Sequence, residues 1–118
     1  MGGALLEGWV VVEAVKAFTN RGRKPDLYFW RSHHGLEVDQ LIQAGTQLHP
    51  IKIKRTAPPT RRHVEPLTRL RALRGDEAAD GGLLVCGVEH ERPMPGGHRA
   101  LRWQAFSAWL EQLLDGTR

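Results

Sequence analysis

The run from Leu83 to Val88 constrains the fold most, because it holds six residues without a single charge. A short apolar run of this kind is typical of a strand that is buried on both faces of a sheet. A sheet covered on both faces needs helices or a second sheet on each side. Helical segments are therefore expected before and after this strand.

The first half of the chain predicts one helix and three strands. Residues 4–18 lack proline and are apolar on nearly every side, which predicts a largely buried helix ending near residues 20–22. The strand predicted at 27–31 is followed by a hairpin turn at 32–35 and a second strand at 36–43. In this second strand, alternation places Leu36, Val38, Gln40 and Ile42 on one face and Glu37, Asp39 and Leu41 on the other.

A third strand is predicted at 48–54, with Ile51 and Ile53 on one face and Lys52 and Lys54 on the other. The second half then predicts a helix capped by Thr60 and running to about Arg74, with Pro66 close to its start. A loop is expected at 89–97, a small strand at 99–102 and an amphipathic helix at 103–114. The order α-β-β-β-α-β-α indicates an α/β sandwich with a mixed sheet.

Length and composition fit one soluble globular domain over residues 1–118. Hydrophobic residues make up 41% and charged residues 25% of the chain, which argues against disorder and coiled coils. No segment approaches the roughly 20 apolar residues of a membrane span, and no signal-peptide pattern is present. We expect a cytoplasmic protein without membrane contact. Cys86 lies within the apolar strand, and we interpret it as a buried structural thiol.

Positive charge is concentrated in one part of the chain. The net charge is +4, and the stretch from 52 to 74 contains one acid, Glu65. Its cations are Lys52, Lys54, Arg55, Arg61, Arg62, Arg69, Arg71 and Arg74. This stretch is a candidate phosphate-contacting surface, and the alternative is a solvated helix face that happens to be basic.

A possible site for phosphodiester chemistry lies on the second and third predicted strands. Metal-assisted hydrolysis requires carboxylates that hold Mg²⁺ and a cation close to the phosphate. Asp39 is a strand carboxylate, and Lys52 and Lys54 project to one side of the next strand. Glu7 is predicted to share a helix stripe with Val11, Val15 and Phe18, where it would be a buried charge in need of a partner.

Four segments carry a resemblance to a known family. They read Gly-Ala-Leu-Leu-Glu-Gly-Trp-Val-Val from Gly3, Leu-Tyr-Phe-Trp-Arg from Leu27, Gly-Leu-Glu-Val-Asp from Gly35 and Pro-Ile-Lys-Ile-Lys from Pro50. Together they resemble the nuclease-like domain of unknown function at the C-terminus of many bacterial and archaeal AAA-type ATPases. The resemblance covers most of the chain and becomes weaker through the strand at 83–88.

The resemblance implies a PD-(D/E)XK restriction-endonuclease-like fold, an α-β-β-β-α-β core with a mixed central sheet flanked by helices. It implies Glu7 as the helix carboxylate, Asp39 as the first strand carboxylate and Lys54 as the site lysine. With Mg²⁺ or Mn²⁺, Asp39 and Glu7 would be the metal ligands. Relatives usually carry glutamate two residues before that lysine, and this chain has Lys52 instead.

Lys52 disrupts the expected site, because ammonium groups repel a divalent cation where a carboxylate would attract it. Glu37 or Glu65 are candidates to replace the missing carboxylate. Alternatively, Lys52 forms a salt bridge to Asp39 or Glu7 and preserves the fold without a metal.

Three functions follow from these observations. The first is a catalytically degenerate nuclease-like module, without cofactor, that binds nucleic acid or docks on an ATPase in cis or in trans. Its nucleic-acid contacts would be Lys52, Lys54, Arg55, Arg61, Arg62 and Arg69. The second is an active Mg²⁺- or Mn²⁺-dependent nuclease, and the third is a structural or protein-interaction domain.

The remaining candidates are interpreted as structural. No zinc-type spacing connects the six histidines, so we expect them at the surface. The four tryptophans are expected mainly in the core. The chain contains no Gly-rich phosphate loop followed by Lys and Ser or Thr, so it is not itself the ATPase.

Overall fold

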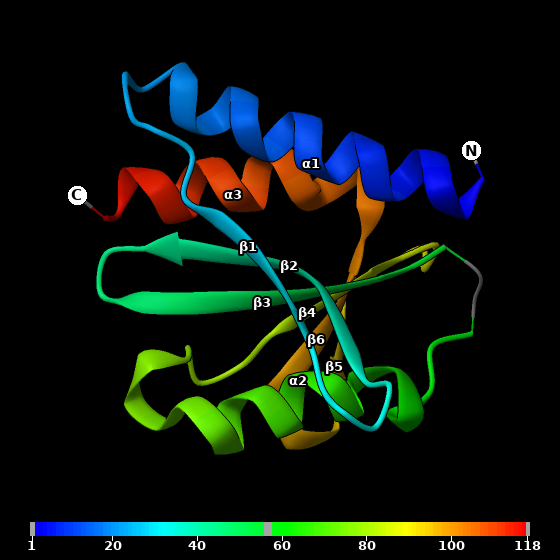
Figure 1. Ribbon diagram of the computed structural model, residues 1–118. Coiled ribbons are helices and arrows are strands. Elements are labelled where there is room, and N and C mark those ends of the chain that lie inside the picture. Colours follow the sequence, from blue (N-terminus) through cyan, green and yellow to red (C-terminus); the bar gives the residue numbers. More distant parts are fainter. Residues whose placement is uncertain (1, 56–57, 118) are drawn as a thin grey trace.

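The computed structural model describes residues 2–55 and 58–117, and these form a six-stranded mixed sheet between two layers of helices (Figure 1). The helices are α1 (Gly3–Thr19), α2 (Arg61–Arg74) and α3 (Phe106–Asp115). The strands are β1 (Leu27–Arg31), β2 (Glu37–Ala44), β3 (Gln47–Lys54), β4 (Leu83–Cys86), β5 (Arg92–Met94) and β6 (His98–Arg102). Short 3-10 turns lie at Gly75–Glu77, Pro95–Gly97 and Trp103–Ala105. The predicted mixed α/β architecture is confirmed.

The strand order across the sheet is β1-β2-β3-β4-β6-β5. β1, β2 and β3 form an antiparallel meander, whereas β4 is parallel to both β3 and β6. The edge strand β5 pairs antiparallel with β6 in a segment where the sequence predicted only a loop. β5 has three residues and includes Pro93, so its signal was too short and too broken to detect.

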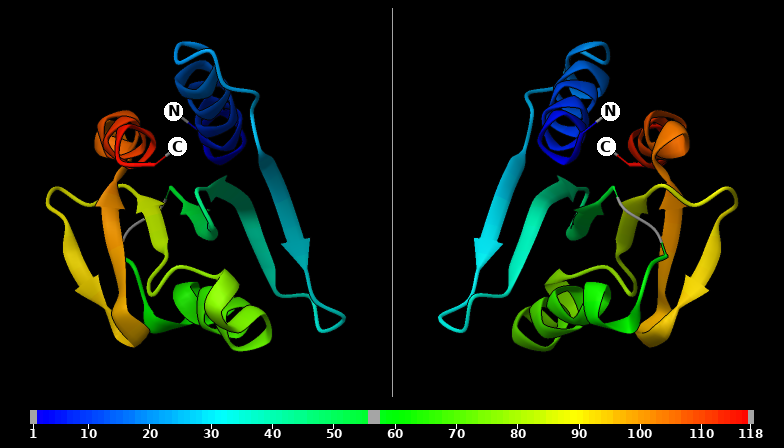
Figure 2. Two further views of the ribbon diagram at one scale, coloured as in Figure 1. Left: turned by 90° about the vertical axis from the view of Figure 1, so that its left-hand side faces the viewer. Right: turned by 90° about the vertical axis from the view of Figure 1, so that its right-hand side faces the viewer.

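One core lies on each face of the sheet. α1 and α3 lie side by side on one face, and α2 covers the other (Figures 1 and 2). Leu83 and Val85 of β4 pack toward α1 and α3, whereas Leu84 and Cys86 pack toward α2. Burial of β4 on both faces is therefore confirmed. The Cys86 thiol is buried as predicted, and this burial raises its pKa.

α1 and the turn after it are joined to α3 and the 3-10 turn before it by aromatic and polar contacts. The rings of Trp9 and Trp103 meet edge to face with centroids 5.5 Å apart. Ser107 Oγ donates a hydrogen bond of 2.7 Å to Glu13 Oε1, and Arg21 Nε donates one of 2.7 Å to Asp115 Oδ1. These contacts help to hold α1 on the face of the sheet opposite α2.

The prediction that α1 is largely buried is wrong in part. Leu6, Val10 and Ala14 are fully buried, but Leu5 is 70% and Val12 55% exposed. An apolar residue on every side of a helix does not reveal which side faces the sheet, because the usual polar stripe is missing. No helix in the described part of the chain is long and apolar enough to cross a membrane.

Candidate functional site at Asp39

A β-bulge in β2 positions the Asp39 side chain. Tyr28 pairs with Leu41 and Trp30 with Val38, so that Asp39 and Gln40 both lie opposite Phe29 of β1. The extra residue interrupts the alternation of side chains, and Val38 and Leu41 pack in the same core next to α2. The prediction that Val38 and Leu41 face opposite sides of the sheet is therefore wrong.

The bulge is supported by its own hydrogen bonds. Gln40 is 5% exposed, and its Nε2 donates a hydrogen bond of 3.0 Å to the carbonyl oxygen of Tyr28. Asp39 Oδ2 accepts a hydrogen bond of 2.7 Å from the backbone N–H of Ile53. The carboxylate thus bridges β2 and β3 at the point where the two strands separate.

Lys52 points to Asp39. Its Nζ lies 3.5 Å from Asp39 Oδ2, and the two side chains are 20% and 13% exposed. One carboxylate oxygen therefore faces both a backbone N–H and an ammonium group. The salt bridge that we considered as an alternative role for Lys52 is present, with Asp39 rather than Glu7 as its partner.

The start of α2 lies beside these lysines. Thr60 N–H donates a hydrogen bond of 3.0 Å to His63 Nδ1, and His63 N–H donates one of 3.0 Å to the Thr60 carbonyl oxygen. Burial, followed by the charges of Lys54 and Lys52, lowers the pKa of His63. A ring that accepts at Nδ1 is neutral with its proton on Nε2, so His63 adds no charge here.

The sequence did not predict that His63 lies beside Lys52 and Lys54. A histidine three residues into a capped helix matches no binding motif that would have singled it out.

The structure does not bring Glu7 to this site. Glu7 is exposed on α1, on the far side of the sheet from α2, and Val11 and Val15 beside it are also exposed. Phe18 alone of the predicted stripe is buried. The expectation of a buried Glu7 is wrong, because the helix turns a different stripe toward the sheet.

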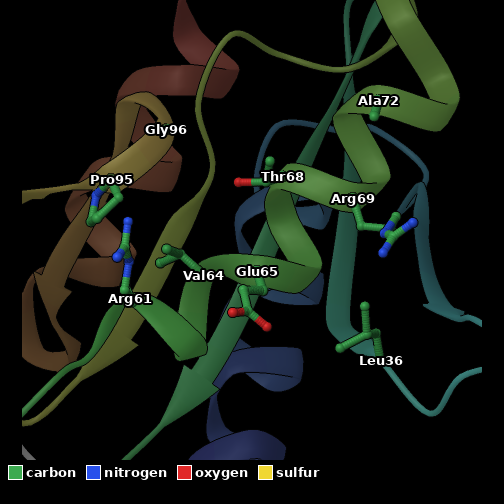
Figure 3. Close-up of a pocket in the computed structure, with 9 residues that line it drawn as sticks. All are labelled: Leu36, Arg61, Val64, Glu65, Thr68, Arg69, Ala72, Pro95 and Gly96. Atoms are coloured by element: carbon green, nitrogen blue, oxygen red, sulfur yellow. The ribbon is translucent and has the colours of Figure 1, made fainter.

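The two candidates to replace the missing carboxylate, Glu37 and Glu65, are also placed elsewhere than beside Asp39. Glu37 Oε1 lies 2.8 Å from Arg31 Nη2 on the neighbouring strand. Glu65 is exposed on α2 and lines an open groove along that helix (Figure 3). Within residues 2–55 and 58–117, no three His, Cys, Asp or Glu side chains are grouped to hold a metal ion. The candidate carboxylates Glu7, Glu37 and Glu65 are thus not grouped with Asp39 as a donor set.

Four cations at the end of β3 and the start of α2 have no carboxylate partner within the described residues. Lys54 ends β3, Arg55 follows it, and Arg61 and Arg62 begin α2, so that all four lie at one end of the molecule (Figure 1). All four are exposed, and none forms an ion pair within the described residues. We call Lys52, Lys54, Arg55, Arg61 and Arg62 the basic rim. Arg69 lies two turns further along α2 and lines the groove.

His98 departs from the expectation that all histidines are at the surface. It is 2% exposed, its Nδ1 accepts a hydrogen bond of 2.8 Å from Gly82 N–H, and its Nε2 lies 2.9 Å from Thr68 Oγ1. Burial, together with the charge of Arg71, lowers the pKa of His98 to about 4. His98 is thus a neutral structural residue that links α2, β6 and the segment before β4.

Comparison with known proteins gives one result about family. No curated protein and no solved structure is significantly similar to the chain. The family model described as "Domain of unknown function (DUF4143)" matches residues 2–106, which is most of the chain. The chain therefore belongs to the DUF4143 family.

Proposed function

We propose that this protein is a nuclease-like accessory domain of the PD-(D/E)XK type that lacks catalysis and binds nucleic acid through the basic rim. The observation that carries the proposal is the Lys52–Asp39 contact of 3.5 Å. An ammonium group stands where a second carboxylate would hold a divalent metal. The carboxylate that remains serves to join β2 and β3.

The basic rim supports a polyanion as the ligand. Its five side chains come from the end of β3, the residue after it and the start of α2, and they gather at one end of the molecule. Neighbouring amide groups at a helix start add partial positive charge. Contacts of this kind are made with phosphates and carry little sequence preference. The resemblance to domains fused to ATPases supports an ATPase in cis or in trans as the machinery that this domain would serve.

Plasmid cleavage with Mg²⁺ and with Mn²⁺ tests the loss of catalysis. The wild-type protein is expected to leave the plasmid intact, because Asp39 has no second carboxylate beside it. Lys52→Glu supplies that carboxylate next to Asp39, and we expect it to gain Mn²⁺ binding, seen as a rise of the melting temperature with added Mn²⁺. Lys52→Gln is the matched control, since it removes the ammonium group without adding a ligand.

Cleavage by the wild-type protein that Asp39→Ala abolishes would contradict the proposal. It would show that a carboxylate from elsewhere completes an active site, as in the metal-dependent nuclease. Binding to duplex DNA is measured separately by anisotropy, so that loss of catalysis and presence of binding are tested independently.

A further inference from the structure

An open groove runs along the exposed side of α2. One hollow of about 690 Å³ is lined by the helix, by Leu36 just before β2 and by Pro95 and Gly96 (Figure 3). A second hollow of about 400 Å³ lies between α2 and the β1–β2 hairpin. Both include Leu36 and Arg69 in their lining, so the two hollows meet at these residues. We call the two hollows together the α2 groove.

The α2 groove has apolar lining that no part of the described chain covers. Leu73 is 64% exposed although it lies on a helix whose other leucines, Leu67 and Leu70, are fully buried. Trp30 of β1 lines the same hollow and packs partly on the core below it. In Figure 2 the hairpin extends to the level of α2, so that the hairpin and the helix form two walls. An exposed leucine between two walls is a typical anchor point for an apolar side chain of a partner.

The charges of the α2 groove are mainly positive. Arg61 lies near one end, Arg69 where the hollows meet, and Arg31 at the hairpin. Arg31 is paired with Glu37, but Arg61 and Arg69 form no ion pair within residues 2–55 and 58–117. Glu65 is the single acid among the lining residues. A ligand that complements this lining carries negative charges beside apolar groups.

The lining distinguishes between two anionic ligands. Single-stranded nucleic acid binds through bases stacked on aromatic rings. The larger hollow has no aromatic residue in its lining, so bases along that part of α2 would have no ring to stack on, and Trp30 lines only the smaller hollow. Arginine pairs with carboxylates and with phosphates alike, but aliphatic side chains of a protein segment also pack on an exposed leucine such as Leu73. The lining therefore favours a protein segment over a nucleic acid.

The length of the α2 groove matches a short helix. Arg61 and Leu73 are 12 residues apart on α2, which corresponds to about 18 Å along the helix axis. A partner helix of about three turns covers this distance and presents apolar side chains every three or four residues. Its flanking positions would face Arg61 and Arg69.

We propose that the α2 groove docks an acidic amphipathic segment of a partner protein, with apolar side chains against Leu73 and Leu36 and carboxylates against Arg61 and Arg69. This interaction goes beyond the nucleic-acid binding proposed above. Arg61 belongs to both surfaces, whereas Leu73 and Leu36 belong to the α2 groove alone, so Leu73→Ser tests the docking separately.

Selection from a random library of 16-residue peptides displayed on phage, against the immobilised full chain, tests this proposal. We expect the selected peptides to carry Asp or Glu around apolar residues at spacings of three or four. The strongest peptide is then synthesised with a fluorescent label, and its affinity is measured by anisotropy. Leu73→Ser and Arg69→Glu should each weaken it by about tenfold or more, since each removes one anchor.

Val12→Ser is the matched control, because Val12 is 55% exposed on α1 and lies across the sheet from the groove. It should leave peptide affinity unchanged, and Leu73→Ser should leave binding to duplex DNA unchanged. Melting temperatures of all variants verify that they are folded.

The proposal is overturned if no peptide is enriched, if the enriched peptides lack acidic residues, or if Leu73→Ser leaves their affinity unchanged. A twelve-residue oligo-dT that binds to the wild-type protein and is weakened by Leu73→Ser would assign the groove to single-stranded nucleic acid and would also overturn it. Failure of duplex binding alone would contradict the proposed function and leave the groove unaffected.

Discussion

Asp39 contributes to stability through two partners, a backbone N–H group and an ammonium group. The Ile53 N–H and the Lys52 ammonium group both lie within reach of one carboxylate oxygen, and both are largely shielded from water. Removal of a shared partner leaves two polar groups that solvent reaches poorly, which is more costly than the loss of one surface ion pair. The Asp39–Lys52 pair therefore has a structural role in joining β2 and β3.

Asp39→Ala is expected to lower the free energy of unfolding by about 1–3 kcal/mol, because it leaves both the N–H and the ammonium group without their partner. Lys52→Met retains the hydrogen bond from Ile53 and should lower it much less. Urea denaturation at neutral pH measures both variants. Equal losses for the two variants would show that the ion pair, and not the backbone hydrogen bond, carries the effect.

His98 predicts how stability depends on pH. Its pKa in the folded protein is about 4, below its ordinary value of 6.5, so the unfolded chain takes up the proton first. The stabilisation is complete above pH 6.5 and is lost as the pH falls toward 4, by about 3 kcal/mol in total. The difference in unfolding free energy between wild type and His98→Gln, measured by urea denaturation from pH 7 to pH 4, should shrink by that order. His34→Gln, at the exposed hairpin turn, is the matched control.

At the level of the elements, two glycines show how the surrounding backbone decides the effect of a substitution by alanine. Gly8 lies within α1, and a methyl group there would meet nothing within 4 Å. Gly81 precedes β4, and a methyl group there would overlap the carbonyl oxygen of Gly97. The close approach lets the segment before β4 lie against the turn before β6.

Gly8→Ala is expected to raise the free energy of unfolding by roughly 0.5–1 kcal/mol, because alanine is the better helix former and has room. Gly81→Ala should lower it by about 2 kcal/mol or more, since the backbone must move apart. Thermal unfolding measures both. A destabilised Gly8→Ala would indicate that the exposed side of α1 is covered in solution.

The charge of the whole molecule predicts the response of nucleic-acid binding to salt. If the five cations of the basic rim contact between three and five phosphates, the plot of log affinity for duplex DNA against log salt has a slope of about −3 to −5. Arg62→Gln should reduce the magnitude of this slope by about one, and Lys24→Gln, an exposed lysine between α1 and β1, should not change it. Anisotropy titrations between about 50 and 200 mM salt measure the slope. Affinity that ignores salt would contradict phosphate contacts.

The sequence by itself determined most of the secondary structure. β1 has the predicted bounds, α2 begins directly after the predicted cap at Thr60, and β4 is buried on both faces. These features depend on local patterns, because capping residues, strand alternation and apolar runs act within a few residues. The three-strand meander and the mixed α/β class follow from the order of these elements. The presence of Asp39 and Lys52 on neighbouring strands also follows from the sequence.

Tertiary structure alone decided which residues meet. The bulge opposite Phe29, the burial of His98 and the exposure of Glu7 depend on partners that are distant in the chain. A one-residue bulge reverses the face of every side chain on one side of it, and no local pattern marks it. The direction of Lys52 toward Asp39 likewise depends on the pairing of two strands. Which stripe of an all-round apolar helix packs on the sheet is chosen by the other helix and the sheet, which is why α1 presented Glu7 to solvent.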